Sequence, residues 1–237
     1  MPSRPALAWV VRLAACASLV LAAAGCDSIG KLGAATHTAP AKTYTISSRV
    51  TAVVIEGGSG SISVIGSARS SVLVWQQAAY SKTPPSATHV LRGTTLTLTY
   101  TCPAELVCGV AYNVQVPSAV SVSVSAGAGG ITLNSLSGPV TARADAGLIT
   151  ANSLGSATAS FTSNAGAVIA AFSSVPESVS ASTNLGPISL TVPDTVAYKI
   201  STHTYVGTSS VTVRESAASA HLIHASSDVG SITISPA

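Results

Sequence analysis

Charged residues are scarce in this 237-residue chain, and so are aromatic residues and long apolar runs. Asp, Glu, Lys and Arg make up 8% of the residues, against about 25% in ordinary globular domains. Arg4 and Arg12 lie near the N-terminus, and from Cys26 onward nine Lys and Arg face eight Asp and Glu. Because no cluster of basic residues could neutralise phosphates, the sequence argues against a nucleic-acid partner.

Recognisable catalytic and metal-binding patterns are also missing. The run Gly58-Ser59-Gly60 lacks the leading glycine of a nucleophile elbow, and no helical pattern follows it. His221 and His224 are three positions apart, so on a strand they would point to opposite faces and could not share a metal ion. We therefore expect no catalytic residue, no metal site and no cofactor, and we interpret the chain as a protein without enzymatic activity.

Acidic residues could cleave a polysaccharide, and aromatic residues could stack on its sugar rings. Polysaccharide-degrading β-helices use clustered acids, whereas the acids here are spread along the sequence: Glu56, Glu105, Asp145, Glu177, Asp194, Glu215 and Asp228. In a repeat structure Arg143 and Asp145 would have Ser, Thr and Asn neighbours, which favours turn and solvent-facing roles. The aromatic residues considered for sugar stacking are Trp75, Tyr80, Tyr112 and Tyr205. For each of these we expect packing in the core or at an edge.

The first 25 residues have the layout of a secretory signal peptide. A basic region precedes an apolar run over residues 13–21, which is too short to span a bilayer comfortably. The segment Leu21-Ala22-Ala23-Ala24-Gly25-Cys26 resembles the lipobox of bacterial lipoproteins, with Ala23 where leucine is usual. The resemblance implies that Cys26 becomes the lipidated first residue of the mature protein. The alternative is an ordinary signal peptide cleaved near Ala24, which would leave Cys26 as a free thiol.

Lipidation would place the protein at the extracytoplasmic face of the cell membrane, with the membrane as a partner through Cys26. Two acyl chains hold a protein stably, since each buried methylene contributes about 0.8 kcal/mol. No other stretch is long and apolar enough to cross a bilayer. Residues 26–43 mix Gly, Ala, Thr and Pro without periodicity, and we expect a flexible tether with a reach of roughly 20–25 Å.

Two cysteines remain for the folded domain. Cys102 and Cys108 have five residues between them, and an even pair in an exported protein predicts a disulfide. Closing so small a loop contributes about 2 kcal/mol on the chain-entropy model. The alternatives are two reduced thiols or half of a metal site, for which no second Cys pair or His cluster is available.

Strand patterns fill the chain from Tyr44 to the C-terminus. Apolar β-branched residues alternate with Ser and Thr, as in Val120–Val124 and Ile188–Val192, so one face is apolar and the other carries hydroxyls. Gly and Pro punctuate every segment, and no window of helical length has an apolar stripe. The sequence predicts an all-β domain over residues 44–237.

A repeat emerges in residues 118–237. A Gly followed closely by an apolar strand start recurs, and the starts are spaced 18, 20, 19, 23 and 21 residues apart at Ile131, Ile149, Ile169, Ile188, Val211 and Ile232. Stacked coils of about 20 residues, each with two short strands, form a β-solenoid. The alternative is a β-sandwich, whose turns usually recur every 8–12 residues. Residues 44–117 have longer loops, and we expect them to form an irregular β cap that covers one end of the stack.

The pattern of segments in residues 114–140 is similar to that of a known family. Val114-Gln-Val-Pro117, the alternating strand at Val120, Gly-Gly-Ile-Thr-Leu133 and Leu136-Ser-Gly-Pro-Val140 resemble the β-strand repeats of the DUF4097/DUF2807 family, which carries the label "putative adhesin". This chain lacks the Asp that frequently follows the coil Gly in that family. The resemblance implies a β-solenoid on an exported or membrane-tethered protein and little about its activity.

The sequence is compatible with three functions. The first is a non-catalytic, membrane-anchored structural or adhesin-like module that contacts a glycan or protein of the cell envelope through its Ser/Thr face. The second is an enzyme acting on envelope polysaccharide, which requires acids from several coils to converge. The third is a lipoprotein that carries a lipid or small molecule, which requires a hollow interior.

Overall fold

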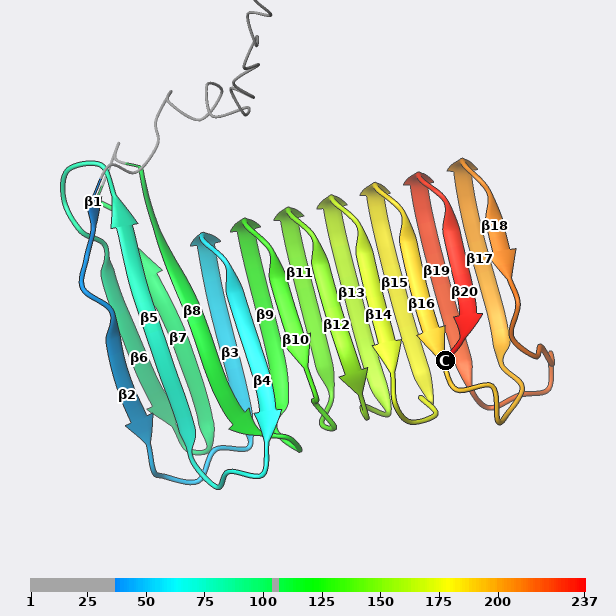
Figure 1. The fold of residues 1–237 in the computed structure, drawn as a ribbon, viewed down its shortest axis with the longest axis horizontal. Coiled ribbons are helices and arrows are strands. Elements are labelled where there is room, and N and C mark those ends of the chain that lie inside the picture. The colour runs from blue at the N-terminus through cyan, green and yellow to red at the C-terminus, as the bar shows by residue number, and fades with distance from the viewer. Residues whose placement is uncertain (1–36, 104–106) are drawn as a thin grey trace, which may run out of the picture. The chain divides into compact units, whose positions relative to one another are not determined.

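The computed structural model describes residues 37–103 and 107–237, which lie within one compact unit, Gly33–Ala237 (Figure 1). Twenty strands and no helix are found among these residues, so the prediction of an all-β domain is confirmed there. The predicted signal peptide, Cys26, most of the predicted tether and Glu105 lie outside the described residues.

The strands form two sheets. Sheet A contains β1 (His37–Thr38), β2 (Lys42–Ile46), β4 (Ile62–Ser67), β5 (Val72–Tyr80), β8 (Cys108–Pro117), β10 (Ile131–Asn134), β12 (Ile149–Leu154), β14 (Val168–Phe172), β16 (Ile188–Val192), β18 (Ser209–Val211) and β20 (Ile232–Pro236). Sheet B contains β3 (Ala52–Ser59), β6 (Ser86–Arg92), β7 (Thr95–Thr101), β9 (Ser121–Ala128), β11 (Val140–Ala146), β13 (Thr158–Ala165), β15 (Ser178–Leu185), β17 (Lys199–Val206) and β19 (Leu222–Val229).

Consecutive strands alternate between the two sheets through the middle of the chain. Each of the pairs β9–β10, β11–β12, β13–β14 and β15–β16 places its first strand in sheet B and its second in sheet A. We call such a pair a coil. Neighbouring coils pair in parallel register in both sheets, for example Ile131 with Ile149 and Val140 with Val122. Because apolar and hydroxyl residues alternate along each strand, the apolar side chains of one sheet face those of the other.

Coils at the C-terminal end do not stack in chain order. The coil β19–β20 inserts between β15–β16 and β17–β18, so the earlier pair β17–β18 forms the edge of both sheets. The spacing of the six predicted strand starts does not reveal this order, in which Ile232 lies between Ile188 and Val211. The register also differs there, because Ser209 pairs with Ile232 and Val211 with Ile234.

The N-terminal part departs from the predicted cap in two ways. Strands β3 and β4, which fall within residues 44–117, form a regular coil that pairs in parallel with β9 and β10. Paired backbone is already present at His37, the first described residue, because β1 lies antiparallel to β5. The remaining strands of this part include antiparallel pairs: β2 and β8 are antiparallel to β5, and β6 is antiparallel to β7.

One predicted strand start is displaced by a single residue. Val168, and not Ile169, aligns with Ile149 and Ile188. Val168 is fully buried, whereas Ile169 is 42% exposed on the outer face of sheet A. Because both residues are apolar and β-branched, the alternating pattern does not show which of them points into the core. A shift of one residue turns every inward side chain of a strand outward.

Val, Ile and Leu side chains fill the space between the sheets, and most are completely buried. A second kind of inward residue is hydroxylated. Ser163, Thr183, Ser227 and Thr204 occupy equivalent positions in successive coils, and each donates a hydrogen bond to the carbonyl of a turn glycine, at 2.9–3.3 Å. These hydroxyls satisfy carbonyls at the edge of the core, which would otherwise be costly to bury.

Glycine occupies the same position in the turn from sheet B to sheet A. At seven of these turns the glycine has a φ of +121° to +158°, namely Gly60, Gly129, Gly147, Gly166, Gly186, Gly207 and Gly230. A Cβ on Gly166 would lie 2.6 Å from the carbonyl carbon of Gly147 in the neighbouring coil. The stacking distance and the backbone conformation therefore both require glycine there.

Candidate interaction surface

The outer face of sheet B is the most regular polar surface of the described chain. Two rows run across β9, β11, β13, β15, β19 and β17, with residues paired from strand to strand. One row contains Ser123, Thr141, Ser160, Ser180, His224 and Ser201, and the other contains Ser125, Arg143, Thr162, Ser182, Ser226 and His203. We call these twelve residues the hydroxyl face. Adjacent strands lie about 4.8 Å apart, so the two rows form a regular array.

Few of these side chains form hydrogen bonds with one another. The hydroxyl of Ser182 lies 3.4 Å from that of Thr162. In the described part of the chain no side-chain partner is found for Ser160, Ser180 or Ser226. Each hydroxyl can donate and accept, so the face offers many hydrogen-bonding groups with only one fixed charge, at Arg143.

A third row lies closer to the glycine turns. Asp145, Asn164, Asn184 and Asp228 are one position before the paired residues Ala146, Ala165, Leu185 and Val229. The amide of Asn164 donates to Asp145 at 3.1 Å. The predicted Ser and Thr neighbours are confirmed for Arg143, which pairs with Ser125 and Thr162, whereas Asp145 has Asn164 on one side and Gly127 on the other.

Imidazole and phenol rings lie on the strands at the C-terminal edge. His203 and Tyr205 meet edge to face on β17 with ring centroids 4.6 Å apart, and Tyr205 is 75% exposed. His224 lies on the hydroxyl face, whereas His221 precedes β19 and its Nδ1 lies 2.8 Å from the carbonyl oxygen of Pro176. The two candidate histidines are therefore separated, and no group of three metal-ligating side chains is found among the described residues.

The acidic residues do not gather at one place in the described structure. Asp194 pairs with Arg214 at 3.4 Å, at the edge opposite the glycine turns. Asp145 and Asp228 lie three strand steps apart in sheet B, which corresponds to about 14 Å. Glycosidases that use two carboxyl groups hold them about 5–9.5 Å apart. Asp145 and Asp228 are therefore too far apart to form such a pair.

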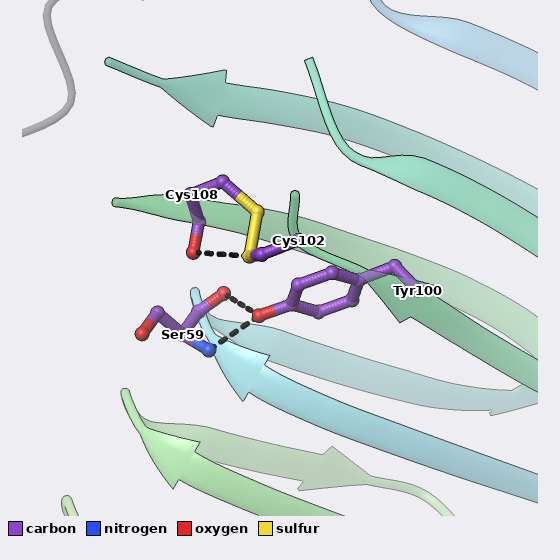
Figure 2. Close-up of a disulfide and its surroundings, with 4 residues drawn as sticks. All are labelled: Ser59, Tyr100, Cys102 and Cys108. Atoms are coloured by element: carbon purple, nitrogen blue, oxygen red, sulfur yellow. Dashed lines mark hydrogen bonds between the residues drawn. A yellow bond between two sulfur atoms is a disulfide. The ribbon is translucent and has the colours of Figure 1, made fainter. Parts of the chain in front are cut away.

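The disulfide between Cys102 and Cys108 is present, as predicted, and joins the end of β7 to the start of β8 (Figure 2). Beside it, the Tyr100 hydroxyl accepts a hydrogen bond from the backbone N–H of Ser59 and donates to the carbonyl of the same residue at 2.8 Å. The Sγ of Cys102 also lies 3.3 Å from the carbonyl oxygen of Cys108. Together these contacts hold β7 against the turn that follows β3.

Aromatic residues mostly support the N-terminal strands. Tyr112 is buried and donates to the carbonyl of Thr99 at 3.3 Å, and burial raises the pKa of its phenol. Burial also raises the pKa of Tyr44 to about 12, and that side chain stacks on His89. Trp75 and Tyr80 are half-buried on β5. Core or edge packing is thus confirmed for Trp75, Tyr80 and Tyr112, whereas Tyr205 protrudes from the edge strand.

Clefts in the described structure are at the surface. One has a volume of about 330 Å³ and lies beside the disulfide, with Thr38, Ser59 and Ala79 among its lining residues. A second, of about 210 Å³, is lined by Tyr198, Lys199 and Glu215 at the opposite edge. Between the sheets, buried apolar side chains form one core cluster. No helix of the described residues is long and apolar enough to cross a membrane.

No family model matches this chain, and no curated protein matches it. Solved structures with similar strand arrangements include a "putative cell adhesion protein" from Clostridium sporogenes, with a TM-score of 0.46 and 12% identity over 84% of this chain and 100% of that one. A "putative adhesin" from Bacteroides fragilis has a TM-score of 0.43 and 13% identity over 84% of this chain and 97% of that one. The function of this chain has to be inferred from its own residues.

Proposed function

We propose that this protein is an exported lipoprotein, anchored in a membrane by diacylated Cys26, which carries a β-solenoid domain as a non-catalytic, adhesin-like interaction module. The proposed anchor rests on the signal-like segment and the lipobox resemblance in residues 1–26. The proposed solenoid is supported by the parallel pairing of successive coils in both sheets. The extracytoplasmic location is consistent with the disulfide.

The hydroxyl face carries the interaction part of the proposal. It extends across six strands with paired Ser and Thr side chains that are half-buried or exposed. A nearly uncharged array of donors and acceptors is suited to an extended ligand that presents hydroxyl or amide groups in a row. We therefore propose a cell-envelope glycan as the ligand of this face.

The two other functions considered from the sequence receive less support. An enzyme acting on polysaccharide would need converging carboxyl groups, and the acids beside the hydroxyl face, Asp145 and Asp228, are about 14 Å apart. A carrier of lipids or small molecules would need an enclosed apolar chamber, whereas buried apolar side chains pack between the described sheets.

Two substitutions within one coil test the role of the hydroxyl face. Ser180 lies on the outer face of β15 in sheet B, and Ser189 lies on the outer face of β16 in sheet A; both are half-buried. A lysine at position 180 would place a long charged side chain across the array. A lysine at position 189 would make the same chemical change on the other sheet and serves as the matched control.

We expect Ser180→Lys to weaken binding to isolated envelope polysaccharide by about tenfold, the effect of losing one or two hydrogen bonds. Ser189→Lys should bind like the unaltered protein, and both variants should keep the same circular dichroism and melting temperature. Equal binding by all three proteins would contradict the role of this face. Failure to recover any envelope component with the protein from crosslinked cells would count against the interaction module itself.

A further inference from the structure

A ridge of exposed apolar residues runs along the edge where the glycine turns lie. The residue before each turn glycine is paired from coil to coil, and the residue after it forms a second row. We call the apolar members of these rows the turn ridge: Ala128, Ala146, Leu148, Ala165, Ala167, Leu185, Pro187, Val229 and Val206. In Figure 1 these turns lie at the upper ends of β9 to β18.

Several of the large apolar side chains that are exposed to solvent lie on this ridge. Leu185 is 57% exposed and Val206 is 62% exposed, while Leu148 and Val229 are 43% and 44% exposed. These four are among the nine large apolar side chains that are exposed in the described chain. The ridge crosses six stacked turns, and five steps of about 4.8 Å give a line roughly 24 Å long. A contiguous apolar line of this kind marks an interaction surface and not scattered surface residues.

The opposite edge of the sheets has a different character. Its connections and strand ends carry most of the charged residues of the described chain, namely Arg49, Arg69, Arg92, Glu177, Asp194, Lys199, Arg214 and Glu215. Asp145 and Asp228 lie one position from ridge residues on the outer face of sheet B, and Lys82 follows β5 at the same edge as the turns. The ridge itself is therefore apolar, whereas most of the charged residues lie at the opposite edge.

The first described residue lies at the same edge as the turn ridge. His37 pairs with Tyr80, which pairs with Cys108, and a Cβ on the adjacent Gly109 would meet the carbonyl oxygen of Ser59 at the β3–β4 turn. Ten residues lie between Cys26 and His37, so eleven Cα–Cα steps join them. They can span at most roughly 40 Å, so an anchor at Cys26 would keep this edge of the domain near the bilayer.

We propose that the turn ridge rests on the surface of the lipid bilayer, with Leu148, Leu185, Val206 and Val229 inserted among the lipid headgroups. This inference rests on the proposed lipid anchor, which supplies a high local concentration of bilayer at this edge. Burial of apolar side chains provides the favourable free energy, at about 25 cal/mol for each Å² removed from water. Because the ridge residues carry no charge, the contact does not depend on anionic lipids.

Tryptophan fluorescence in vesicles tests this contact. The full chain is expressed with its N-terminal segment, purified from membranes and reconstituted into phosphatidylcholine vesicles that contain brominated acyl chains. Trp75→Phe provides the background, and Trp9 leaves with the predicted signal peptide. Leu185→Trp and Val206→Trp place the probe on the ridge, and Ser174→Trp places it at an exposed position of the opposite edge.

We expect the two ridge probes to lose emission in brominated vesicles and to shift to shorter wavelength, while the probe at position 174 is unchanged. Intact mass and vesicle flotation of the same samples report the anchor separately. A lipidated, vesicle-bound protein whose ridge probes are not quenched would overturn the inference and leave the anchor standing. Ridge probes that shift without quenching, in a protein that crosslinks as a dimer, would also overturn it, because a second copy would then cover the ridge. Quenching without the lipid mass would support the ridge contact and overturn the anchor.

Discussion

Replacement of Gly166 by alanine tests the reasoning about the stacked turns. Gly166 has a φ of +150°, and an added Cβ would lie 2.6 Å from the carbonyl carbon of Gly147 and closer still to its oxygen. A positive φ in a residue with a side chain costs about 1–3 kcal/mol. Forcing two coils apart around one methyl group adds about 1–3 kcal/mol more. We therefore expect Gly166→Ala to lower the free energy of unfolding by about 3 kcal/mol or more.

Gly130→Ala is the matched control. Gly130 lies one residue after the turn glycine Gly129, its φ is not positive, and the nearest heavy atom to an added Cβ is the Leu148 oxygen at 3.6 Å. This variant should be neutral or more stable by a few tenths of a kcal/mol, because alanine restricts the unfolded chain. Urea titrations of both variants followed by circular dichroism give the comparison, provided that the slope with denaturant is unchanged. A Gly166→Ala protein within about 0.5 kcal/mol of the Gly130→Ala protein would refute the reasoning.

Three further predictions follow from other contacts. Cys102→Ala with Cys108→Ala should destabilise the domain by about 2 kcal/mol, and reduction of the unaltered protein should lower its melting temperature in the same way; no change would mean that β7 and β8 are held by other contacts. Thr183→Val should cost about 1–2 kcal/mol in urea titrations, because it leaves the carbonyl of Gly166 without its hydroxyl donor; Ser182→Ala, on the outer face of the same strand, is the control and should cost much less. The raised pKa of Tyr44, about 12 in place of 10.0, means that the unfolded chain loses this proton first. Stability should therefore fall as pH rises from 10 to 12, and Tyr44→Phe should show a smaller fall.

The strands and the turn glycines could be predicted from the sequence because both depend on local patterns of residues. Alternation in Val120–Val124 and Ile188–Val192 identifies the buried face, and Gly before an apolar strand start identifies the turn. Register at Val168 and Ile169 was not accessible, since both residues are apolar and β-branched. The inward hydroxyl of Thr183 could have been found by counting in twos from Ala181, which is buried on the same strand.

The order of the coils in space could not be predicted. β17–β18 and β19–β20 carry the same pattern as the earlier coils, and nothing local specifies which of them stacks on β15–β16. The same holds for β3–β4, which lies between β9–β10 and the strands β7 and β8 although it precedes all of them in the chain. Such choices depend on contacts between distant segments. The Ser and Thr residues of the hydroxyl face were predicted to point outward, but their alignment into two continuous rows depends on the register of six strands.

The lipid anchor is the central claim, and intact mass spectrometry of the protein extracted from its native membrane tests it most directly. The account predicts a chain of residues 26–237 that carries a diacylglyceryl group, and a gain of two hydrogens on reduction of the disulfide. An unlipidated chain that begins near Gly25 would contradict the account. It would make the protein a secreted module without an anchor.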